Sequence, residues 1–490
     1  MLIFVIDVGT SSMRGILYDE QAHVKLQHQI TYRPQFLSSG IVEQNPQDWR
    51  RGLYELCGAL GDYLREGGKH PDAIALTAQR SSVIPVSAQG EALSNAIMWQ
   101  DQRTLPMKEE LACHEQEIFR RSGSPVNPVF SGCKMRWLRR NRPELYHDAA
   151  KLIVIPDYLV HEMTGEFLTD TTYGARSLLM NLRTGDWDEQ LLEWFGIDRE
   201  KLCTIVPPGS VCGTLTEAFA AQCGLRAGTP VVTAGGDQQC AALGLGILGS
   251  GDAEITTGTG AFILAGLDSL PETLEPNIIY GASAVPGRYL LEGSILTCCS
   301  AFDWFVRENY SECDCKNYCR VNEEIAQAEG TPVIVLPYFQ GRATPDWNSA
   351  ATASVHGLTL CTKRGDIARA ILEGVCHEIV CNLDIMRCHT GELRRVHIGG
   401  GLTKSPVFPQ LEADVLQLPL LRWNNPEATA LGAWVQGAIA VGRFTDYREA
   451  VSAAHADDEE MCFVPRADMA EHYRAKQREF ERLYHAQFGK

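Results

Sequence analysis

The chain alternates short apolar runs with longer stretches whose apolar residues recur at helical spacing. Residues 2–8 and 14–19 are apolar runs on either side of the turn GTSS, a pattern typical of two strands. Residues 46–64 have helical spacing, and residues 72–77 and 83–86 again resemble strands. Residues 166–228 are interpreted as loop-rich. This alternation predicts an α/β fold.

A second hairpin signal follows near the middle of the chain. TPVVTAGGDQQCAALGLG (229–246) predicts strand, glycine turn and helix, and GDAEITTGTGAFILAG (251–266) predicts strand, Gly-Thr turn and strand. The second hairpin resembles the opening DVGTSSMRGIL, which suggests a doubled fold. Strand and helix patterns continue to a helix at 407–417, and residues 469–488 predict a final docking helix.

Length and composition set the class of protein. A chain of 490 residues exceeds one compact core, so two or three domains are expected. The proportions of hydrophobic (45%) and charged (21%) residues are those of an ordinary globular protein. A formal charge of −17 argues against nucleic acid or an anionic membrane surface as partner. Small phosphates remain compatible, because local amide groups bind them.

The start of the chain bears on where the protein is found. MLIFVIDVG has no basic flank and reaches Asp7 too early for a secretory signal. No stretch approaches the ~20 apolar residues of a membrane span. Seventeen cysteines without a leader favour a reducing compartment, so the predicted location is cytoplasmic.

The glycine motifs narrow the chemistry. GLGILG (244–249) fits G-x-G-x-x-G but closes a helix, and Walker A, G-x-S-x-G and H-E-x-x-H motifs do not occur. Three turns, DVGT, TTGTG and IGGG, each follow a strand-type run. One alone would be a hairpin with a polar turn. Three together favour a polyphosphate site, because glycine lets backbone N–H groups approach phosphate closely.

Longer motifs carry a resemblance to a known family. They are DVGTSSMR (7–14), AIMWQDQR (96–103), FSGCKMRWL (130–138), GGDQQ (235–239), TTGTG (256–260), PYFQGRATP (337–345) and GGGLTKSP (399–406). In this order and spacing they resemble the FGGY family of carbohydrate kinases over nearly the whole chain. The resemblance implies an α/β fold of two ribonuclease-H-like domains (the actin/hexokinase ATPase type) flanking a central cleft. Their predicted extents are 1–248, with the sugar side and the base, and 249–490, with the nucleotide side.

The same resemblance assigns the catalytic chemistry. The family transfers the γ-phosphoryl group of ATP to a sugar or polyol hydroxyl, and a carboxylate accepts the hydroxyl proton. That base corresponds to Asp237, whose alternative role is to cap the helix that it opens. Asp7 corresponds to the carboxylate near Mg²⁺ and the transferring phosphoryl group. Asp7 and Asp237 are therefore the expected Mg²⁺ residues, through water where they do not bind it directly.

Binding residues follow from the same alignment of motifs. The sugar-side residues implied are Arg80, Ser81, Trp99, Asp237, Gln238 and Phe262. The nucleotide-side residues implied are Gly9, Thr10, Ser11, Arg14, Gly258, Thr259, Gly260, Gly400, Gly401 and Ser405. Core packing is the alternative role for Trp99 and Phe262. Cys299 stands where relatives usually have glycine close to the nucleotide, which changes that pocket.

Two positions depart from the glycerol kinases, which offer the nearest local matches within the family. Ser81 replaces their glutamate, and Val129 replaces their tyrosine. Both changes remove bulk and a polar contact, and a site that loses hydroxyl-binding partners discriminates less. We therefore expect a substrate larger than glycerol: a sugar or polyol of four to six carbons.

Two other functions fit parts of this pattern. A non-catalytic sensor could bind nucleotide and sugar without chemistry, although it would not need the carboxylates Asp7 and Asp237. A sugar-independent ATPase on the same fold would lack the sugar-side set. The expected partner is a small molecule rather than nucleic acid or membrane, and a homo-oligomer is compatible with the family.

Overall fold

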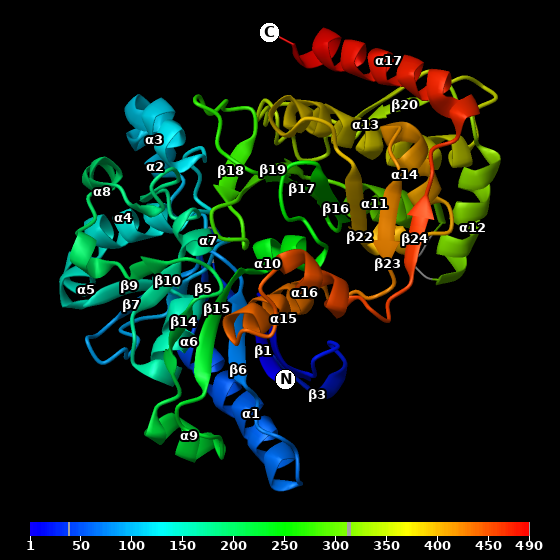
Figure 1. The fold of residues 1–490 in the computed structure, drawn as a ribbon. Helices are drawn as coiled ribbons and strands as arrows, with labels where there is room; N and C mark the ends of the chain where they lie inside the picture. The colour runs from blue at the N-terminus through cyan, green and yellow to red at the C-terminus, as the bar shows by residue number, and fades with distance from the viewer. Residues whose placement is uncertain (38–39, 311–314, 490) are drawn as a thin grey trace.

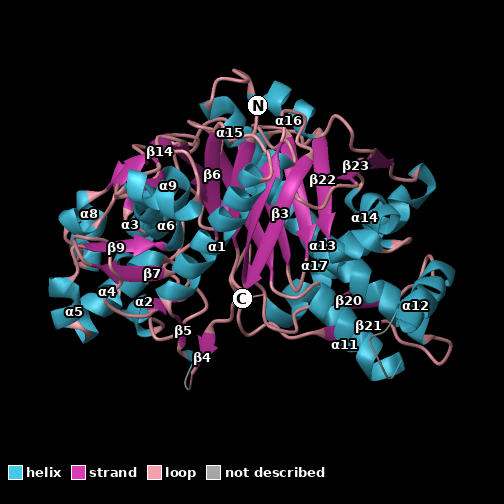
Figure 2. Ribbon diagram, turned by 90° about the horizontal axis from the view of Figure 1, so that it is seen from below, coloured by secondary structure: helices cyan, strands magenta, loops and turns pink. Residues whose placement is uncertain are grey.

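The structure is a computed structural model that describes residues 1–37, 40–310 and 315–489. Two large sheets lie side by side, with helices on their outer sides (Figures 1 and 2). Among the described residues, no helix has both the length and the apolar character that crossing a membrane requires.

The first sheet places three strand ends at one edge. Its order is β14 (Val211–Thr214), β15 (Pro230–Gly236), β6 (Ala73–Ala78), β1 (Ile3–Val8), β2 (Ser12–Tyr18) and β3 (Val24–Thr31). β6 runs parallel to both β1 and β15, whereas β1 and β2 form an antiparallel hairpin. The carboxyl ends of β1, β6 and β15 therefore meet, which is where open α/β sheets bind ligands.

The second sheet repeats this arrangement. Its order is β18 (Ile279–Ala282), β19 (Tyr289–Ile295), β17 (Ala261–Leu267), β16 (Asp252–Thr257), β22 (Arg395–Gly400), β23 (Leu420–Trp423) and β24 (Glu460–Phe463). β16 and β17 form a hairpin, and β16, β22 and β23 run parallel, as β1, β6 and β15 do. The doubled α/β fold expected from the two hairpins is confirmed.

Two helices, α10 (Asp237–Gly244) and α15 (Ala428–Ala440), pack against each other on the side of the first sheet that faces the second. α10 follows β15 directly, and α15 crosses it. α15 comes late in the chain, yet it packs against β1, β6 and β15 of the first sheet (Figure 1). Ile3 and Val5 of β1 share one buried cluster with Leu431 and Trp434 of α15.

The long helices match their sequence patterns. α1 (Pro46–Arg65) covers the other face of the first sheet, and α13 (Arg364–Thr390) packs against the second. The helices expected at 407–417 and 469–488 are α14 (Phe408–Leu416) and α17 (Ala470–Phe488). Residues 166–228, expected to be loop-rich, instead contain short elements such as β10 (Leu168–Asp170), α7 (Thr171–Gly174), α8 (Glu189–Phe195) and α9 (Glu217–Cys223).

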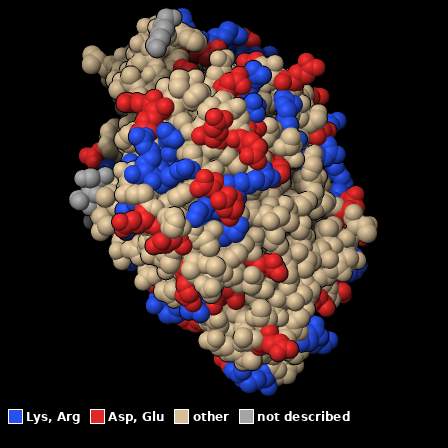
Figure 3. Space-filling model, turned by 90° about the vertical axis from the view of Figure 1, so that its left-hand side faces the viewer, with Lys and Arg blue, Asp and Glu red and all other residues tan. Residues whose placement is uncertain are grey.

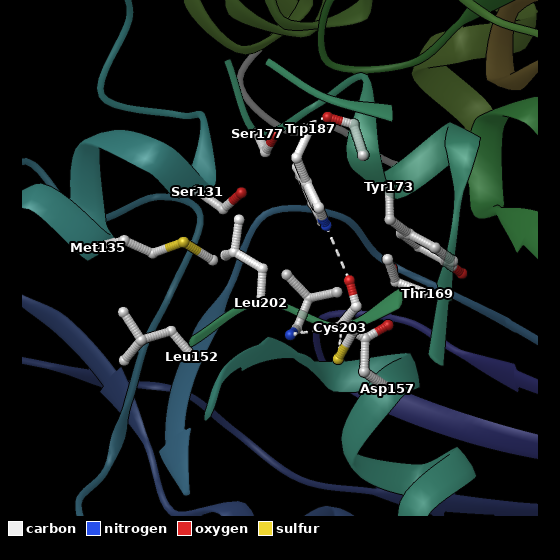
Figure 4. A pocket seen from close by; sticks show the side chains of 12 residues that line it. Ser131, Met135, Leu152, Asp157, Thr169, Tyr173, Ser177, Trp187, Leu202 and Cys203 are labelled. Atoms are coloured by element: carbon white, nitrogen blue, oxygen red, sulfur yellow. Dashed lines mark hydrogen bonds between the residues drawn. The ribbon is translucent and has the colours of Figure 1, made fainter. Parts of the chain in front are cut away.

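A smaller layer lies outside the first sheet. It contains β7 (Val83–Val86), β9 (Lys151–Val154), α4 (Ser131–Asn141) and α6 (Ile155–Thr164). A cavity of ≈ 20 Å³, enough for about one water, lies inside this layer (Figure 4). Asp157 lines it and accepts a hydrogen bond from the Val154 N–H at 3.1 Å. Burial raises the pKa of Asp157 to about 7.

The outer face of this layer carries mixed charge. Lysine and arginine side chains lie beside aspartates and glutamates there (Figure 3). On α4, for example, Arg139 pairs with Asp198 and Arg140 pairs with Glu110. Pairing of this kind leaves no large field of one sign on the face shown.

Candidate active site

The strand ends of the first sheet bring three predicted residues together. Asp7 lies near the end of β1, Arg80 follows β6, and Asp237 follows β15. Gly236 is the N-cap of α10, so Asp237 is the first helical residue rather than the cap. Its Oδ1 accepts the Gln238 N–H at 2.8 Å. The positive end of α10 therefore lies at this carboxylate.

Asp7 is held by an ion pair. Its Oδ2 lies 2.7 Å from Nη2 of Arg14, and Nη1 of Arg14 lies 2.6 Å from Oε2 of Glu427. Glu427 immediately precedes α15. Arg14 thus links the first hairpin to the last part of the chain, and its guanidinium has a carboxylate on either side.

The first glycine turn faces the same space. The Gly9 N–H donates to the Ser12 carbonyl at 2.8 Å, and the Tyr32 hydroxyl donates to the Gly9 carbonyl at 2.7 Å. The indole N–H of Trp99 donates to the Thr10 hydroxyl at 3.1 Å. Ser11 is exposed at the tip of the turn. These bonds fix the turn's shape and join it to Trp99.

Arg80 fills the space beside Asp237. Its guanidinium donates to the side-chain carbonyls of Gln238 and Gln239, and its Nε lies 3.6 Å from Oδ1 of Asp237. A Cβ on Gly236 would lie 2.7 Å from Cδ of Arg80, so glycine is needed for this approach. Burial raises the pKa of Asp237, the charge of Asp7 adds to the rise, and Arg80 and Arg176 oppose it.

The second glycine turn is built by backbone contacts. The Gly258 N–H donates to the Gly260 carbonyl at 2.8 Å, and Thr259 accepts the Cys298 N–H at 2.8 Å. Gly400 has φ +92°, and a Cβ there would lie 2.0 Å from the Thr257 carbonyl oxygen. Only glycine fits that position, which packs the third glycine turn against the second.

Cys299 and Ser405 lie beside these turns in different ways. The Cys299 N–H donates to the Gly258 carbonyl at 2.9 Å, and its Sγ lies 3.6 Å from where a Cβ on Gly401 would be. Ser405 instead donates to Asn322 at 2.9 Å and accepts the N–H of Val407. The structure thus groups Cys299 with the glycine turns, whereas the Ser405 hydroxyl is used locally.

A cavity of ≈ 330 Å³ lies between the two sheets at this point. It is lined by predicted residues, namely Thr10, Arg80, Ser81, Trp99, Asp237, Gln238 and Phe262, and by Val129. Trp99 and Phe262 are 37% and 39% exposed, so they form cavity walls rather than core packing. The predicted sugar-side set therefore surrounds one space.

Sequence reasoning missed several residues of this cavity. They are Gln79, Pro125, Asn127, Phe130, Arg176, Ile279, Glu292, Ser294, Leu296 and Trp347. Arg176, in the loop after α7, and Glu292, on β19 of the second sheet, form a buried ion pair, and Nη1 of Arg80 lies 3.7 Å from Glu292. The two partners are far apart in the chain, so no local motif marks them.

The carboxylates of the cleft fit a magnesium ion that arrives with a nucleotide. Mg²⁺ usually takes one or two protein carboxylates and completes its shell with phosphate oxygens and water. Asp7 is close enough to influence the pKa of Asp237. No group of three or more His, Cys, Asp or Glu side chains forms a metal cage in the described part of the chain. The donor set suits a nucleotide-borne ion.

Comparison with known proteins supports the family resemblance that the sequence motifs carry. Residues 2–244 match the N-terminal domain, and residues 253–441 the C-terminal domain, of the FGGY family of carbohydrate kinases. Glycerol kinase from Deinococcus radiodurans is 31% identical over 97% of this chain and 95% of that protein.

Two solved structures extend this likeness to the fold. Xylulose kinase from Rhodospirillum rubrum has a TM-score of 0.93 at 25% identity and covers 99% of both chains. Plasmodium falciparum glycerol kinase with ADP has a TM-score of 0.90 at 26% identity and covers 99% of this chain and 98% of that one.

Proposed function

This chain belongs to the FGGY family of carbohydrate kinases and phosphorylates a sugar or polyol with ATP, and we propose that Asp237 is the general base of the reaction. The observation that carries the proposal is the position of its carboxylate, in the wall of the 330 Å³ cavity and 3.6 Å from Arg80. A raised pKa makes this carboxylate a stronger proton acceptor while Arg80 limits the rise.

Of the other residues, one set binds the sugar and another binds the nucleotide. Arg80, Trp99, Gln238 and Phe262 orient the sugar so that one hydroxyl lies against Asp237. The glycine turns at 9–11 and 258–260, with Gly400 and Gly401, let the backbone approach the nucleotide closely, while the N–H groups of Gly9 and Gly258 hold the shape of the turns. Preorganisation of this kind supplies much of the rate in phosphoryl transfer.

The family requires a metal ion with ATP, and we assign Mg²⁺ to Asp7 and Asp237, through water where contact is indirect. When bound, Mg²⁺ neutralises charge on the phosphates. Arg14 keeps the Asp7 carboxylate in place from the side that faces Glu427.

The cavity supports a substrate of four to six carbons. Ser81 has φ +73°, and its hydroxyl donates to the Arg176 carbonyl at 3.3 Å, so it is already engaged by the protein. Val129 lines the same wall with an apolar surface. Asn127 and Trp347 also line this cavity and add an amide and an indole to its wall.

The test is ADP release from Mg·ATP across glycerol, four- to six-carbon polyols, ketoses and deoxysugars. We expect one acceptor of four to six carbons to exceed glycerol clearly, and Asp237→Asn to lower its kcat by about 10²–10⁴-fold. Equal use of glycerol and all longer acceptors would refute the size assignment. ADP release that ignores every acceptor would refute the role of Asp237. Replacing Mg²⁺ with Ca²⁺ or no divalent ion tests the metal.

A further inference from the structure

A second cavity of ≈ 190 Å³ adjoins the active site on its other side. It lies between β16 and β17 of the second sheet and the helices α10 and α15. Its lining is Asp237, Gln238, Ala241, Glu254, Thr256, Phe262, Leu264 and Thr429. Three of these residues also line the 330 Å³ cavity, so the two spaces share a wall.

Glu254 lines this second cavity without a partner. Its side chain is only 3% exposed, and its Oε2 is buried without a hydrogen-bond partner. No ion pair to Glu254 is found among the described residues. A buried carboxylate left unpaired is costly, which is why buried charges are nearly always paired or bound to metal.

Glu292, two strands away from Glu254 in the same sheet, is a buried glutamate that does have cationic partners. Glu254 lies opposite Leu264 on β17, and Leu264 lies opposite Glu292 on β19, so the three share one face of the sheet. Glu292 has Arg176 and Arg80 as cationic neighbours. Opposite Glu254 on the adjacent strand β22 lies His397, and burial lowers the pKa of its imidazole to about 4, so it is uncharged. The cavity itself is lined by Ala241, Gln238 and Asp237 of α10 and Thr429 of α15, none of them basic.

The polar groups around this cavity suit a hard cation. Thr256 and Thr429 supply hydroxyl oxygens and Glu254 a carboxylate, whereas the amide oxygen of Gln238 already accepts from Arg80. Oxygen donors select alkali and alkaline-earth ions over softer metals. Burial raises the pKa of Glu254 to about 8, so a bound cation would displace a proton below that pH.

We propose that the Glu254 cavity binds one small hard cation, with Glu254 as its charged ligand and the hydroxyls of Thr256 and Thr429 as neutral ligands. The ion is K⁺, Na⁺ or an Mg²⁺ additional to that of the nucleotide. The ion neutralises Glu254, as Arg176 and Arg80 neutralise Glu292. Because α10 and α15 form one wall and the second sheet the other, the ion stabilises their association.

The test compares unfolding temperatures without nucleotide or sugar, at constant ionic strength and above the pKa of Glu254. The salts are the chlorides of K⁺, Na⁺, Mg²⁺ and tetramethylammonium, the last being a cation whose methyl groups keep oxygen ligands away from its charge. We expect one small cation to raise the Tm of the wild type saturably, by about 2 °C or more. Glu254→Gln should lose this response.

Glu412 provides a matched control. It is also fully buried and both of its carboxylate oxygens lack a partner, but it lies on α14 and does not line this cavity. Glu412→Gln therefore removes a similar acid and should keep the cation response. Loss of the response in both variants, or retention in Glu254→Gln, would overturn the proposal.

Two further measurements distinguish cation binding in the Glu254 cavity from Mg²⁺ binding at Asp7. An Mg²⁺ response that disappears in Asp7→Asn but persists in Glu254→Gln belongs to the nucleotide's ion and contradicts the proposal. Near pH 7, adding the effective cation to wild type should release protons to an indicator dye, and Glu254→Gln should release fewer. Absence of that difference, or of any cation effect on wild type, also overturns it.

Discussion

At the scale of single residues, carboxylates of the same cleft differ in what neutralises them. Asp7 is in a 2.7 Å ion pair with Arg14, and Glu292 is paired with Arg176, so an arginine directly neutralises each of these two carboxylates. Asp237 is 3.6 Å from Arg80 and has room beside it in the cavity. The looser pairing leaves an oxygen of Asp237 available to a substrate hydroxyl.

Arg80 sets the pH range of that base. Its positive charge lowers the pKa of Asp237 against the effect of burial. Because the base must be ionised, Arg80→Gln should move the acidic limb of the kcat/KM–pH profile to higher pH. Loss of a charged contact should also lower the maximum by about 10–100-fold. An unchanged acidic limb would contradict this account. Arg482→Gln, at an exposed site on α17, is the control.

Asp157 should make stability depend on pH. Its pKa is about 7 in the folded protein against an ordinary 3.8, so the folded state binds more protons between these values. Unfolding free energy therefore falls as pH rises from about 4 to about 7, by about 1.4 kcal/mol for each unit of pKa shift. Asp157→Asn keeps an acceptor for the Val154 N–H and should flatten denaturant midpoints over this range. A wild type and variant with equal slopes would refute the assignment.

At the scale of elements, short segments are positioned by groups that only the folded chain brings together. The ammonium of Lys134 on α4 is fully buried and donates to the carbonyls of Pro128 and Val129 at 2.7 and 2.9 Å, and to that of Phe130. Val129 and Phe130 line the sugar cavity. The sequence motif containing Lys134 thus shapes the cavity wall from behind rather than contacting the substrate.

The crossing of α10 and α15 depends on glycine. A Cβ on Gly432 would lie 1.8 Å from the Cys240 carbonyl oxygen, so the helices cannot stay this close with alanine there. Gly432→Ala should push α15 from α10, lower the unfolding free energy by about 1–3 kcal/mol and reduce kcat, because Asp237 begins α10.

Gly58 on α1 is the matched control for this prediction. A Cβ there meets nothing within 4 Å, so Gly58→Ala should stabilise the protein by up to about 1 kcal/mol through helix propensity. Chemical denaturation of both variants measures the contrast. Equal effects at the two positions would show that close packing at Gly432 is not limiting.

The elements that sequence reasoning found are those with strong periodic patterns. Helix α1 and the hairpin β16–β17 fall within a few residues of their predicted bounds, and the α/β class follows from their alternation. The short elements between residues 166 and 228 were missed, because two- to seven-residue segments carry too few positions to show a period.

At the candidate site too, only some of the residues could be predicted from the sequence. Asp7 and Asp237 could be predicted because each lies in a recognisable motif beside a strand, and Arg80 because the family resemblance implies it. Arg176, Glu292 and Glu254 could not, since their roles arise from a partner, or a missing partner, that is distant in the sequence.

At the scale of the whole molecule, the division of the chain into two halves does not match how the helices pack on the two sheets. The predicted boundary near residue 248 assigns α15 to the second half, but α15 covers β1, β6 and β15 of the first. Leu431 and Trp434 are fully buried in that contact. Burial of each large apolar side chain stabilises by about 1.5–3 kcal/mol, so the first sheet depends on a helix from the far end of the sequence.

A fragment of residues 1–248 should therefore not fold alone. It would expose Ile3, Val5 and the rest of the sheet face that α15 covers, and a large apolar patch favours aggregation. We expect it to be insoluble or to melt without a cooperative transition, whereas co-expression with residues 249–490 should recover a complex. Circular dichroism melts measure this. A fragment that unfolds cooperatively near the full chain's Tm would show that the first half is an independent domain and that α15 adds little to its stability.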